Sequence, residues 1–279
     1  MNTVIVGLGV IGGSFAMGLK RIGRGPVFAI DTNRDTLQKA LDQGLIAAGD
    51  GDGSALLKAA DLVILCIYPH SVPGFLNAHR DDFKPGCLLT DVTGVKSALA
   101  EELKGLLPTG VDFVLGHPMA GREKMGFDFA SDAVFRGANY LLCPLLQTKE
   151  EHLRLVEELA LELGFRRVRR ISPQLHDELI AHTSQLPHAM AVALINSDRK
   201  GRETGQFIGD SYRDLTRIAK INASLWSELF LSNKEALLAA MEDFSAQFSL
   251  LKEAIRREDK DALRALFESS TTRREKLDE

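Results

Sequence analysis

Residues 4–12, Val4-Ile5-Val6-Gly7-Leu8-Gly9-Val10-Ile11-Gly12, decide the fold of this chain. A short β-branched run leads into three glycines with the spacing G-x-G-x-x-G. Phe15, Leu19 and Ile22 then follow at helical spacing. The order is strand, glycine turn and helix, which is the context that a dinucleotide-binding turn requires. The stretch therefore predicts a Rossmann-type nucleotide-binding unit.

Each glycine of this turn has a separate expected role. Gly7 would permit the tight turn, Gly9 the close approach of a pyrophosphate, and Gly12 the packing of the helix on the strand. Val10 and Ile11 complete the predicted cofactor-binding turn. The pyrophosphate would rest at the helix N-terminus, where free N–H groups and the helix dipole favour an anion.

A second strand is predicted at 27–30, and Asp31 follows it about 20 residues after the glycines. A carboxylate at this place binds the ribose hydroxyls in such folds, although Asp31 can also be a cap for the helix expected at 32–45. Because it would repel a 2′-phosphate, NAD is favoured over NADP. Arg34 could accommodate that phosphate, so NADP stays the less favoured alternative.

Strands and helices alternate up to residue 171. Strands are expected at 62–67, 87–90, 111–115, 139–143 and 165–171, and helices after Pro69, at 95–107 and at 150–163. This alternation predicts an α/β domain over 1–171, with a doubly wound, mostly parallel sheet. Residues 122–136 lack clean periodicity and are predicted to form a loop beside His117.

Polar residues follow two of these strands where the carboxyl ends of parallel strands meet. Cys66 and Tyr68 are expected on the adenine or ribose side of the cofactor. In the next turn, Asp91-Val92-Thr93-Gly94-Val95-Lys96, the side chains of Thr93 and Lys96 are candidates to line the nicotinamide pocket. The alternative is that Asp91 or Thr93 simply caps the following helix.

His117 follows the strand predicted at 111–115, within Gly116-His117-Pro118-Met119-Ala120-Gly121. Histidine is the side chain best matched to proton transfer near neutral pH, and Pro118 restricts the backbone after it. A buried histidine that is hydrogen-bonded at a strand end is the structural alternative.

From Ser172 to the end of the chain the periodicity is helical, so a second, all-α domain is predicted over 172–279. Ser172 and Pro173 match an N-cap and a first helical residue. Pro187 should kink this helix beside Ser184 and His188, which share a face. Such a kink can be architectural, but these two flanking residues favour a role in forming a site.

Arg213 and Arg217 lie four residues apart in a predicted helix that follows a polar, glycine-containing loop at 200–209. Like charges at this spacing disfavour an isolated helix, and a substrate carboxylate would relieve the cost. Alternatively, each arginine pairs with an acid such as Asp210 or Asp214.

Asn222 is the predicted cap of a long helix with an apolar stripe that is either core or dimer surface. The stripe consists of Leu225, Leu229, Leu237, Met241, Phe244, Phe248 and Leu251. Trp226 is either an interface anchor or a lid on the ligand. The tail from Asp259 is expected to form one more charged helix.

Composition narrows the classes of function. The chain has 279 residues, 45% of them hydrophobic, and a net charge of −4 with acids and bases intermixed, which favours a small-molecule ligand over nucleic acid or a membrane. Cys66, Cys87 and Cys143 lack metal-site spacing and are expected to be reduced thiols, which indicates a cytoplasmic protein without a metal. No membrane span or signal peptide is expected.

In combination, these motifs resemble the prephenate/arogenate (cyclohexadienyl) dehydrogenase family of tyrosine biosynthesis. The resemblance rests on residues 7–12, 91–96, 116–121, 176–188 and 213–219. It implies an NAD(P)-dependent oxidative decarboxylation, in which hydride leaves the ring carbon bearing the 4-hydroxyl, carbon dioxide departs and the ring becomes aromatic.

The resemblance also implies roles for single residues. His117 would accept a hydrogen bond and then the proton from the 4-hydroxyl, His188 would contact the substrate, and Arg217 would hold a substrate carboxylate. Ser184 and Arg213 complete the substrate-binding candidates, together with Gln185. The family is typically dimeric through its helical domain, which implies a homodimer.

Two positions depart from the family pattern. Gly94 stands where the family often has a serine that helps to orient the hydroxyl and the nicotinamide, and the neighbouring Thr93 is the candidate catalytic replacement. Gln185 stands where many relatives have histidine, so this side chain can form hydrogen bonds but cannot titrate. With no sequence for a regulatory or mutase domain, a stand-alone dehydrogenase is expected.

Two other functions are compatible with the sequence. A β-hydroxyacid-type dehydrogenase would share the architecture, but the catalytic lysine motif of that group is not found in the helical half. A non-catalytic NAD-binding sensor could use Arg213 and Arg217 to bind a metabolite.

Overall fold

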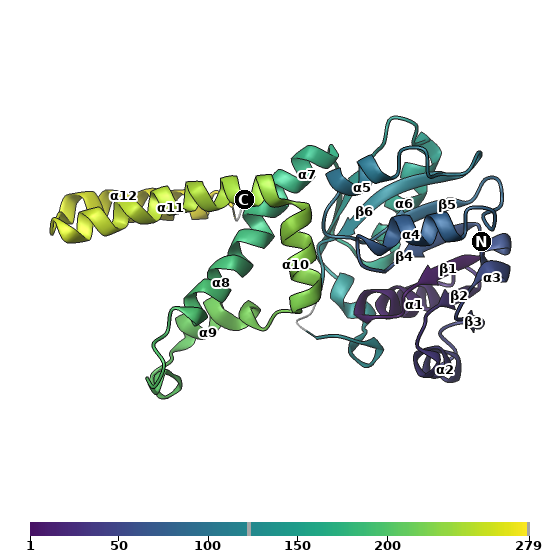
Figure 1. The fold of residues 1–279 in the computed structure, drawn as a ribbon, viewed down its shortest axis with the longest axis horizontal. Coiled ribbons are helices and arrows are strands. Elements are labelled where there is room, and N and C mark those ends of the chain that lie inside the picture. Colours follow the sequence, from purple (N-terminus) through teal and green to yellow (C-terminus); the bar gives the residue numbers. More distant parts are fainter. Residues whose placement is uncertain (122–123, 278–279) are drawn as a thin grey trace. The chain divides into compact units, whose positions relative to one another are not determined.

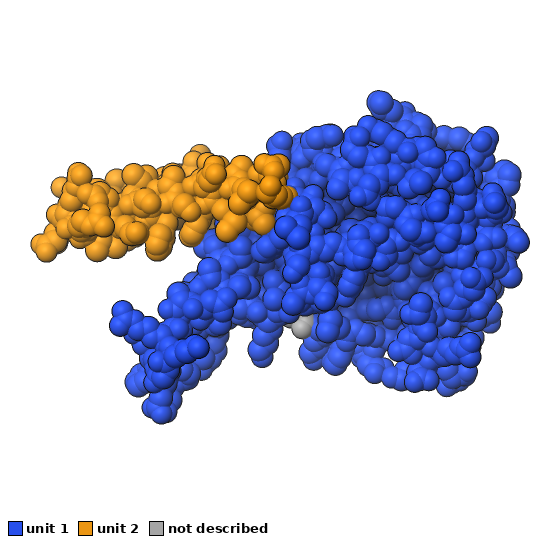
Figure 2. All heavy atoms as spheres, viewed as in Figure 1, with its two compact units in different colours: residues 1–233 blue, residues 234–279 orange. Residues whose placement is uncertain are grey.

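The computed structural model describes residues 1–121 and 124–277. The chain divides into two compact units, residues 1–233 and residues 234–279, which Figure 2 distinguishes by colour. The first unit contains an eight-stranded sheet with its covering helices and a further group of helices. The second unit contains two helices.

The sheet has the strand order β3-β2-β1-β4-β5-β6-β7-β8. Its strands are β1 (Thr3–Val6), β2 (Val27–Ile30), β3 (Ala48–Asp50), β4 (Leu62–Leu65), β5 (Leu88–Asp91), β6 (Asp112–Pro118), β7 (Asn139–Cys143) and β8 (Arg167–Arg170). All neighbouring strands pair in parallel except β6 and β7. The order reverses between β1 and β4, and ligands bind at such switch points. The predicted doubly wound, mostly parallel sheet is confirmed.

Helices cover both faces of the sheet (Figure 1). One core receives side chains from α1 (Val10–Ile22), α2 (Arg34–Asp42) and α6 (Glu150–Leu163), and the other from α3 (Ser54–Ala59), α4 (Ser71–Ala78) and α5 (Ser97–Glu102). Successive strand residues point to opposite faces: Ile5 and Ile64 lie in the first core, whereas Val4 and Val63 lie in the second. Burial on both faces explains why these strands are continuously apolar.

Strand β6 is longer than predicted. The expected strand ends at Leu115, but in the structure it continues through His117 to Pro118. The antiparallel strand β7 causes this extension, because Leu141 pairs with His117 and Tyr140 with Pro118. His117 is therefore held within the sheet.

The segment after β6 was predicted to be a loop over 122–136, and two of its residues, 122 and 123, lie outside the described residues. Seven of the remaining residues form two 3₁₀ helices, η1 (Phe127–Phe129) and η2 (Asp132–Phe135), both packed on α1. Phe127 and Phe135 are buried in the first core. The prediction of a loop is wrong for these residues, because aromatic burial anchors them to the domain.

The remaining elements of the first unit are helical. They are α7 (Pro173–Ile180), the π-helical η3 (Ala181–Gln185), α8 (Leu186–Asn196), η4 (Thr204–Gln206), α9 (Asp210–Thr216), η5 (Arg217–Ala219) and α10 (Ala223–Ser232). The Ser172 hydroxyl accepts a hydrogen bond from the Leu175 N–H, which confirms the predicted cap. Pro187 lies in the first turn of α8, directly after the π-helical turn. A π-helical turn is a known cause of helix kinks, and the kink at Pro187 stays a prediction.

The second unit consists of α11 (Lys234–Arg256) and α12 (Lys260–Glu275), which pack on one another. Asn222 caps α10 as predicted, but that helix ends before Asn233, so the apolar stripe lies on two helices instead of one. Met241 and Phe248 on α11 are exposed. Among residues 1–121 and 124–277, no helix is both long and apolar enough to cross a membrane.

Candidate active site

The glycine turn between β1 and α1 has the predicted geometry. Gly7 has φ +89°, and a Cβ built on it would lie 2.6 Å from the Cys66 carbonyl oxygen. A Cβ on Gly12 would lie 1.9 Å from the Gly7 oxygen, whereas a Cβ on Gly9 meets nothing within 4 Å. The first and third glycines are thus required for packing. Gly9 leaves open space, which suits the approach of a pyrophosphate to the first turn of α1, where Val10 and Ile11 lie.

Asp31 is joined to this turn. One of its carboxylate oxygens accepts a hydrogen bond from the Leu8 N–H at 2.7 Å, and the other accepts one from the Asn33 N–H at 2.8 Å. Asn33, not Asp31, caps α2 by accepting hydrogen bonds from two N–H groups of its first turn. Asp31 therefore lies against the glycine turn, and the alternative that it caps the helix is wrong.

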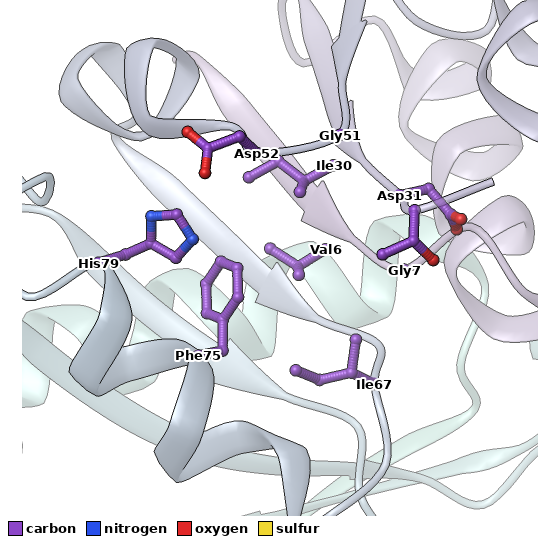
Figure 3. A pocket seen from close by; sticks show the side chains of 10 residues that line it. Val6, Gly7, Ile30, Asp31, Gly51, Asp52, Ile67, Phe75 and His79 are labelled. Carbon is purple, nitrogen blue, oxygen red and sulfur yellow. The ribbon is translucent and has the colours of Figure 1, made fainter. Parts of the chain in front are cut away.

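A cavity of about 290 Å³ opens beside Asp31 (Figure 3). It is lined by Val6, Gly7, Ile30, Asp31, Thr32, Gly51, Asp52, Ile67, Phe75 and His79. Apolar side chains together with the carboxylates of Asp31 and Asp52 suit an adenosine, so the residues present fit a dinucleotide. The sequence pattern does not single out Phe75 on α4 or His79 directly after it, because their spacing is that of ordinary core residues.

The loop after β4 carries the predicted cofactor residues Cys66 and Tyr68 on either side of Ile67, which lines the cavity. Burial raises the pKa of the Cys66 thiol, which is therefore neutral. The Tyr68 hydroxyl accepts a hydrogen bond from the Asn222 side chain at 3.0 Å. This loop thus contacts the start of α10 at the carboxyl edge of the sheet.

Asp91 ends β5 and does not cap the following helix. Its carboxylate accepts hydrogen bonds from the Thr93 N–H at 2.9 Å, the Gly116 N–H at 3.1 Å and the Lys96 ammonium at 2.5 Å. The Thr93 hydroxyl donates to the same carboxylate and accepts from the Lys96 ammonium at 3.0 Å. All three side chains are buried, so the Thr93 hydroxyl is occupied inside this network.

The side chain of His117 is partly exposed and lies beside this network. Its Nδ1 is 2.9 Å from Nε2 of His176 on α7. Burial holds the pKa of His117 well below its usual value of 6.5, and His176 and Lys96 lower it further. The imidazole is therefore neutral near pH 7 and able to accept a proton.

Gly94 lies beside the His117 ring. A Cβ built on Gly94 would lie 4.0 Å from Cε1 of His117 and 3.1 Å from Cδ2 of Leu229 on α10. Leu229 thus occupies the side of the turn where a residue larger than glycine would project.

The helical side of the site contains His188 and Ser184. Nδ1 of His188 donates a hydrogen bond to the Ser184 carbonyl oxygen at 2.8 Å, and its ring stacks on Trp226 with centroids 3.7 Å apart. Gln185 points into the protein instead: its amide donates to the Leu229 carbonyl at 3.0 Å and accepts from Asn233 at 2.8 Å. Gln185 is buried, so these contacts occupy both ends of its amide.

Of the two predicted arginines, Arg213 lies in α9 and Arg217 directly follows that helix. Arg213 is 3.3 Å from the Asp210 carboxylate, which is the pairing anticipated as the alternative to a substrate contact. Arg217 is exposed and begins η5, which packs on α8, the helix that carries His188.

The structure brings together one cluster that the sequence pattern does not reveal. His176 is completely buried, and its Nδ1 lies 2.7 Å from the Asp177 carboxylate. That carboxylate accepts hydrogen bonds from the N–H groups of Lys96 and Ser97, at 2.9 Å and 2.8 Å. Helix α7 is thereby tied to the start of α5 beside His117.

Comparisons with known proteins agree with this architecture. Two family models match: prephenate dehydrogenase, nucleotide-binding domain, over residues 15–169, and prephenate dehydrogenase, dimerization domain, over residues 172–269. A solved prephenate dehydrogenase from Aquifex aeolicus, in complex with hydroxyphenyl propionate and NAD⁺, is 33% identical, with a TM-score of 0.89 over 99% of this chain and 98% of its own.

Two further relatives have related activities. Arogenate dehydrogenase from Synechocystis is 28% identical, with a TM-score of 0.84 over 99% of this chain and 100% of its own. Cyclohexadienyl dehydrogenase from Zymomonas mobilis is 29% identical over 96% of this chain and 93% of its own length.

Proposed function

This chain belongs to the prephenate dehydrogenase family, and we propose that it catalyses the NAD-dependent oxidative decarboxylation of prephenate, arogenate or both in tyrosine biosynthesis. The product would be 4-hydroxyphenylpyruvate from prephenate and tyrosine from arogenate. One observation carries the proposal: the neutral imidazole of His117 lies at the carboxyl edge of the sheet that also carries the glycine turn.

The glycine turn and Asp31 would hold the dinucleotide, with the Cys66–Tyr68 loop beside it. NAD, when bound, supplies the acceptor for the hydride that leaves the substrate ring. His117 would accept the proton of the 4-hydroxyl as the hydride leaves. The base would therefore lie next to the oxygen that becomes a carbonyl. Because the Thr93 hydroxyl is engaged by Asp91 and Lys96, we give Thr93 a positioning role in place of the catalytic one.

Arg217 would hold a substrate carboxylate, with His188 and Ser184 on the neighbouring helical segment. Arg213, which pairs with Asp210, would contribute less to substrate binding. Gln185 would stabilise the helical segment that carries these residues through its hydrogen bonds to the Leu229 carbonyl and from the Asn233 amide.

We further propose that the two predicted domains have separate functions. Residues 1–171 would bind NAD, and residues 172–279 would bind substrate and form a homodimer, since the second family model is a dimerization domain. The three cysteines are free thiols, which supports a reducing, cytoplasmic setting.

The test is the appearance of NADH with prephenate and with arogenate. Activity with either supports the proposal, and His117→Asn should lower kcat by about 10²–10⁴ because it removes the base. His152→Asn is a control, since His152 pairs with Asp112 away from this edge of the sheet. NAD binding without turnover of either substrate would instead identify a sensor.

A further inference from the structure

Three side chains form a continuous chain of hydrogen bonds behind the proposed base. Nδ1 of His117 meets Nε2 of His176 at 2.9 Å, and Nδ1 of His176 meets Oδ1 of Asp177 at 2.7 Å. His117 comes from β6 and is partly exposed, whereas His176 and Asp177 come from α7 and are buried. The proposed function gives no role to His176 or Asp177.

The carboxylate at the inner end determines where the protons lie. Burial alone would raise the pKa of Asp177, but hydrogen bonds from His176 and the Ser97 N–H outweigh it and lower the pKa, so the carboxylate is ionised. An ionised carboxylate only accepts hydrogen bonds, so Nδ1 of His176 must donate.

The same logic fixes both imidazoles. Burial lowers the pKa of His176 despite its bond to Asp177, so the ring is neutral and its Nε2 carries a lone pair. Nδ1 of His117 must then be the donor between the two rings, which leaves Nε2 of His117 as an acceptor. Within residues 1–121 and 124–277, no hydrogen bond of the protein involves that Nε2 atom.

The charged groups around the two rings disfavour the protonated, positively charged form of His117. Lys96 disfavours a proton on both rings, and the neutral His176 gives the first ring no compensating charge. Asp177 and Asp91 favour a proton on His176, and the nearby Cys143 thiol is neutral because burial raises its pKa. A charge on His176 would lie in direct contact with a carboxylate.

We propose that His176 receives the proton through His117 during the reaction, so that the pair forms a relay that ends beside Asp177. The O–H bond of the substrate hydroxyl breaks as Nε2–H forms on His117, and Nδ1–H of His117 breaks as Nε2–H forms on His176. The hydride and carbon dioxide leave as in the proposed function, on which this inference rests. Loss of carbon dioxide leaves a phenolate oxygen in place of the hydroxyl, and the proton returns from His176 through His117 to that oxygen, so the product leaves as the phenol and no net proton is released.

The decisive variant is His176→Gln. A glutamine amide can accept from His117 and donate to Asp177, so it preserves the orientation of His117, but it cannot take a proton. The relay predicts that kcat falls at least tenfold, that the KM values for NAD and substrate change less than threefold, and that the acidic limb of the kcat/KM profile moves to lower pH. His152→Gln is the matched control, because His152 forms a comparable histidine–carboxylate pair at 2.7 Å with Asp112.

A kcat within twofold of wild type in folded His176→Gln would overturn the relay. Should this variant fail to fold, ¹⁵N NMR of the wild-type imidazoles decides: protonation at Nδ1 of both His117 and His176 supports the relay, and an Nε2–H tautomer of either overturns it. Wild-type NADH formation in the same assay separates the two proposals. An inactive wild type contradicts the proposed function, whereas an active wild type with an equally active His176→Gln contradicts only the relay.

Discussion

The ammonium of Lys96 lies 2.5 Å from the carboxylate of Asp91, and both side chains are completely buried. Asp91 also holds the Gly116 N–H, directly before His117, and the Lys96 N–H is bound to Asp177. One buried ion pair therefore joins β5, β6 and α7 around the proposed base. An arrangement with so many bonded partners fixes the position of His117 before any ligand arrives.

Lys96→Met should destabilise the protein by about 3–5 kcal/mol, because it leaves the Asp91 carboxylate buried without its counter-charge. Urea denaturation measures the free energy of unfolding. Lys104→Met is the control, since Lys104 and its partner Glu101 are largely exposed and such pairs contribute about 1 kcal/mol or less. Equal effects of the two changes would contradict the importance of the buried pair.

Gly9→Ala and Gly12→Ala should fail in different ways. The new methyl at position 9 meets no protein atom, so we expect stability to change by about 1 kcal/mol or less while NAD binding weakens. The methyl at position 12 would collide with the Gly7 backbone, so that variant should unfold or express poorly. Thermal unfolding and NAD titration of both variants provide the comparison, and undiminished NAD affinity in Gly9→Ala would refute the expected approach of the pyrophosphate.

Asp31→Asn should lower kcat/KM for NAD by about tenfold or more, because hydrogen bonds to a charged group contribute about 1.5–3 kcal/mol. The efficiency with NADP should fall less, since the change also removes a charge that repels the 2′-phosphate. Asp35→Asn, in the first turn of α2, provides a control. Parallel losses with both cofactors would argue against a contact between Asp31 and the ribose.

Arg217→Ala should chiefly raise the KM for the carboxylated substrate, by about tenfold or more, with a smaller effect on kcat. Arg213→Ala should have a weaker effect, because the proposed contact with the substrate carboxylate is made by Arg217. Steady-state kinetics with saturating NAD distinguish the two. A larger KM effect for Arg213→Ala would exchange the roles of the arginines.

Stability should fall as the pH is lowered below 6.5. The pKa of His117 is lower in the folded protein than in the unfolded chain, so over this range the unfolded state binds the proton more readily. His117→Asn removes this contribution, and the stability difference between wild type and variant should shift in favour of the variant on acidification. Urea denaturation at about pH 7.5 and pH 5.5 tests the sign, and a difference independent of pH would contradict it.

The parts of the structure that depend on local chemistry follow from the sequence. The glycine turn, the position of Asp31 and the Ser172 cap each depend on neighbouring residues, so spacing was enough to predict them. The end of β6 could not be predicted, because His117 stays in the strand only through pairing with Leu141 on an antiparallel neighbour.

The hydrogen-bond partners of the polar side chains could not be predicted from the sequence pattern either. Gln185 and Ser184 are adjacent on η3, but the Gln185 amide is bonded internally because Leu229 and Asn233 from a distant helix meet it. The pairing of His176 could not be predicted either, because its partner His117 lies 59 positions away in the sequence. Such pairings depend on tertiary packing, which local periodicity does not encode.

The position of Leu229 beside Gly94 has a consequence for any replacement of this glycine. A serine introduced at position 94 would bring its Cβ to 3.1 Å from the leucine, which would have to give way. The two positions should therefore be epistatic: a serine becomes acceptable once position 229 is smaller, and a double substitution should be tolerated better than the single one.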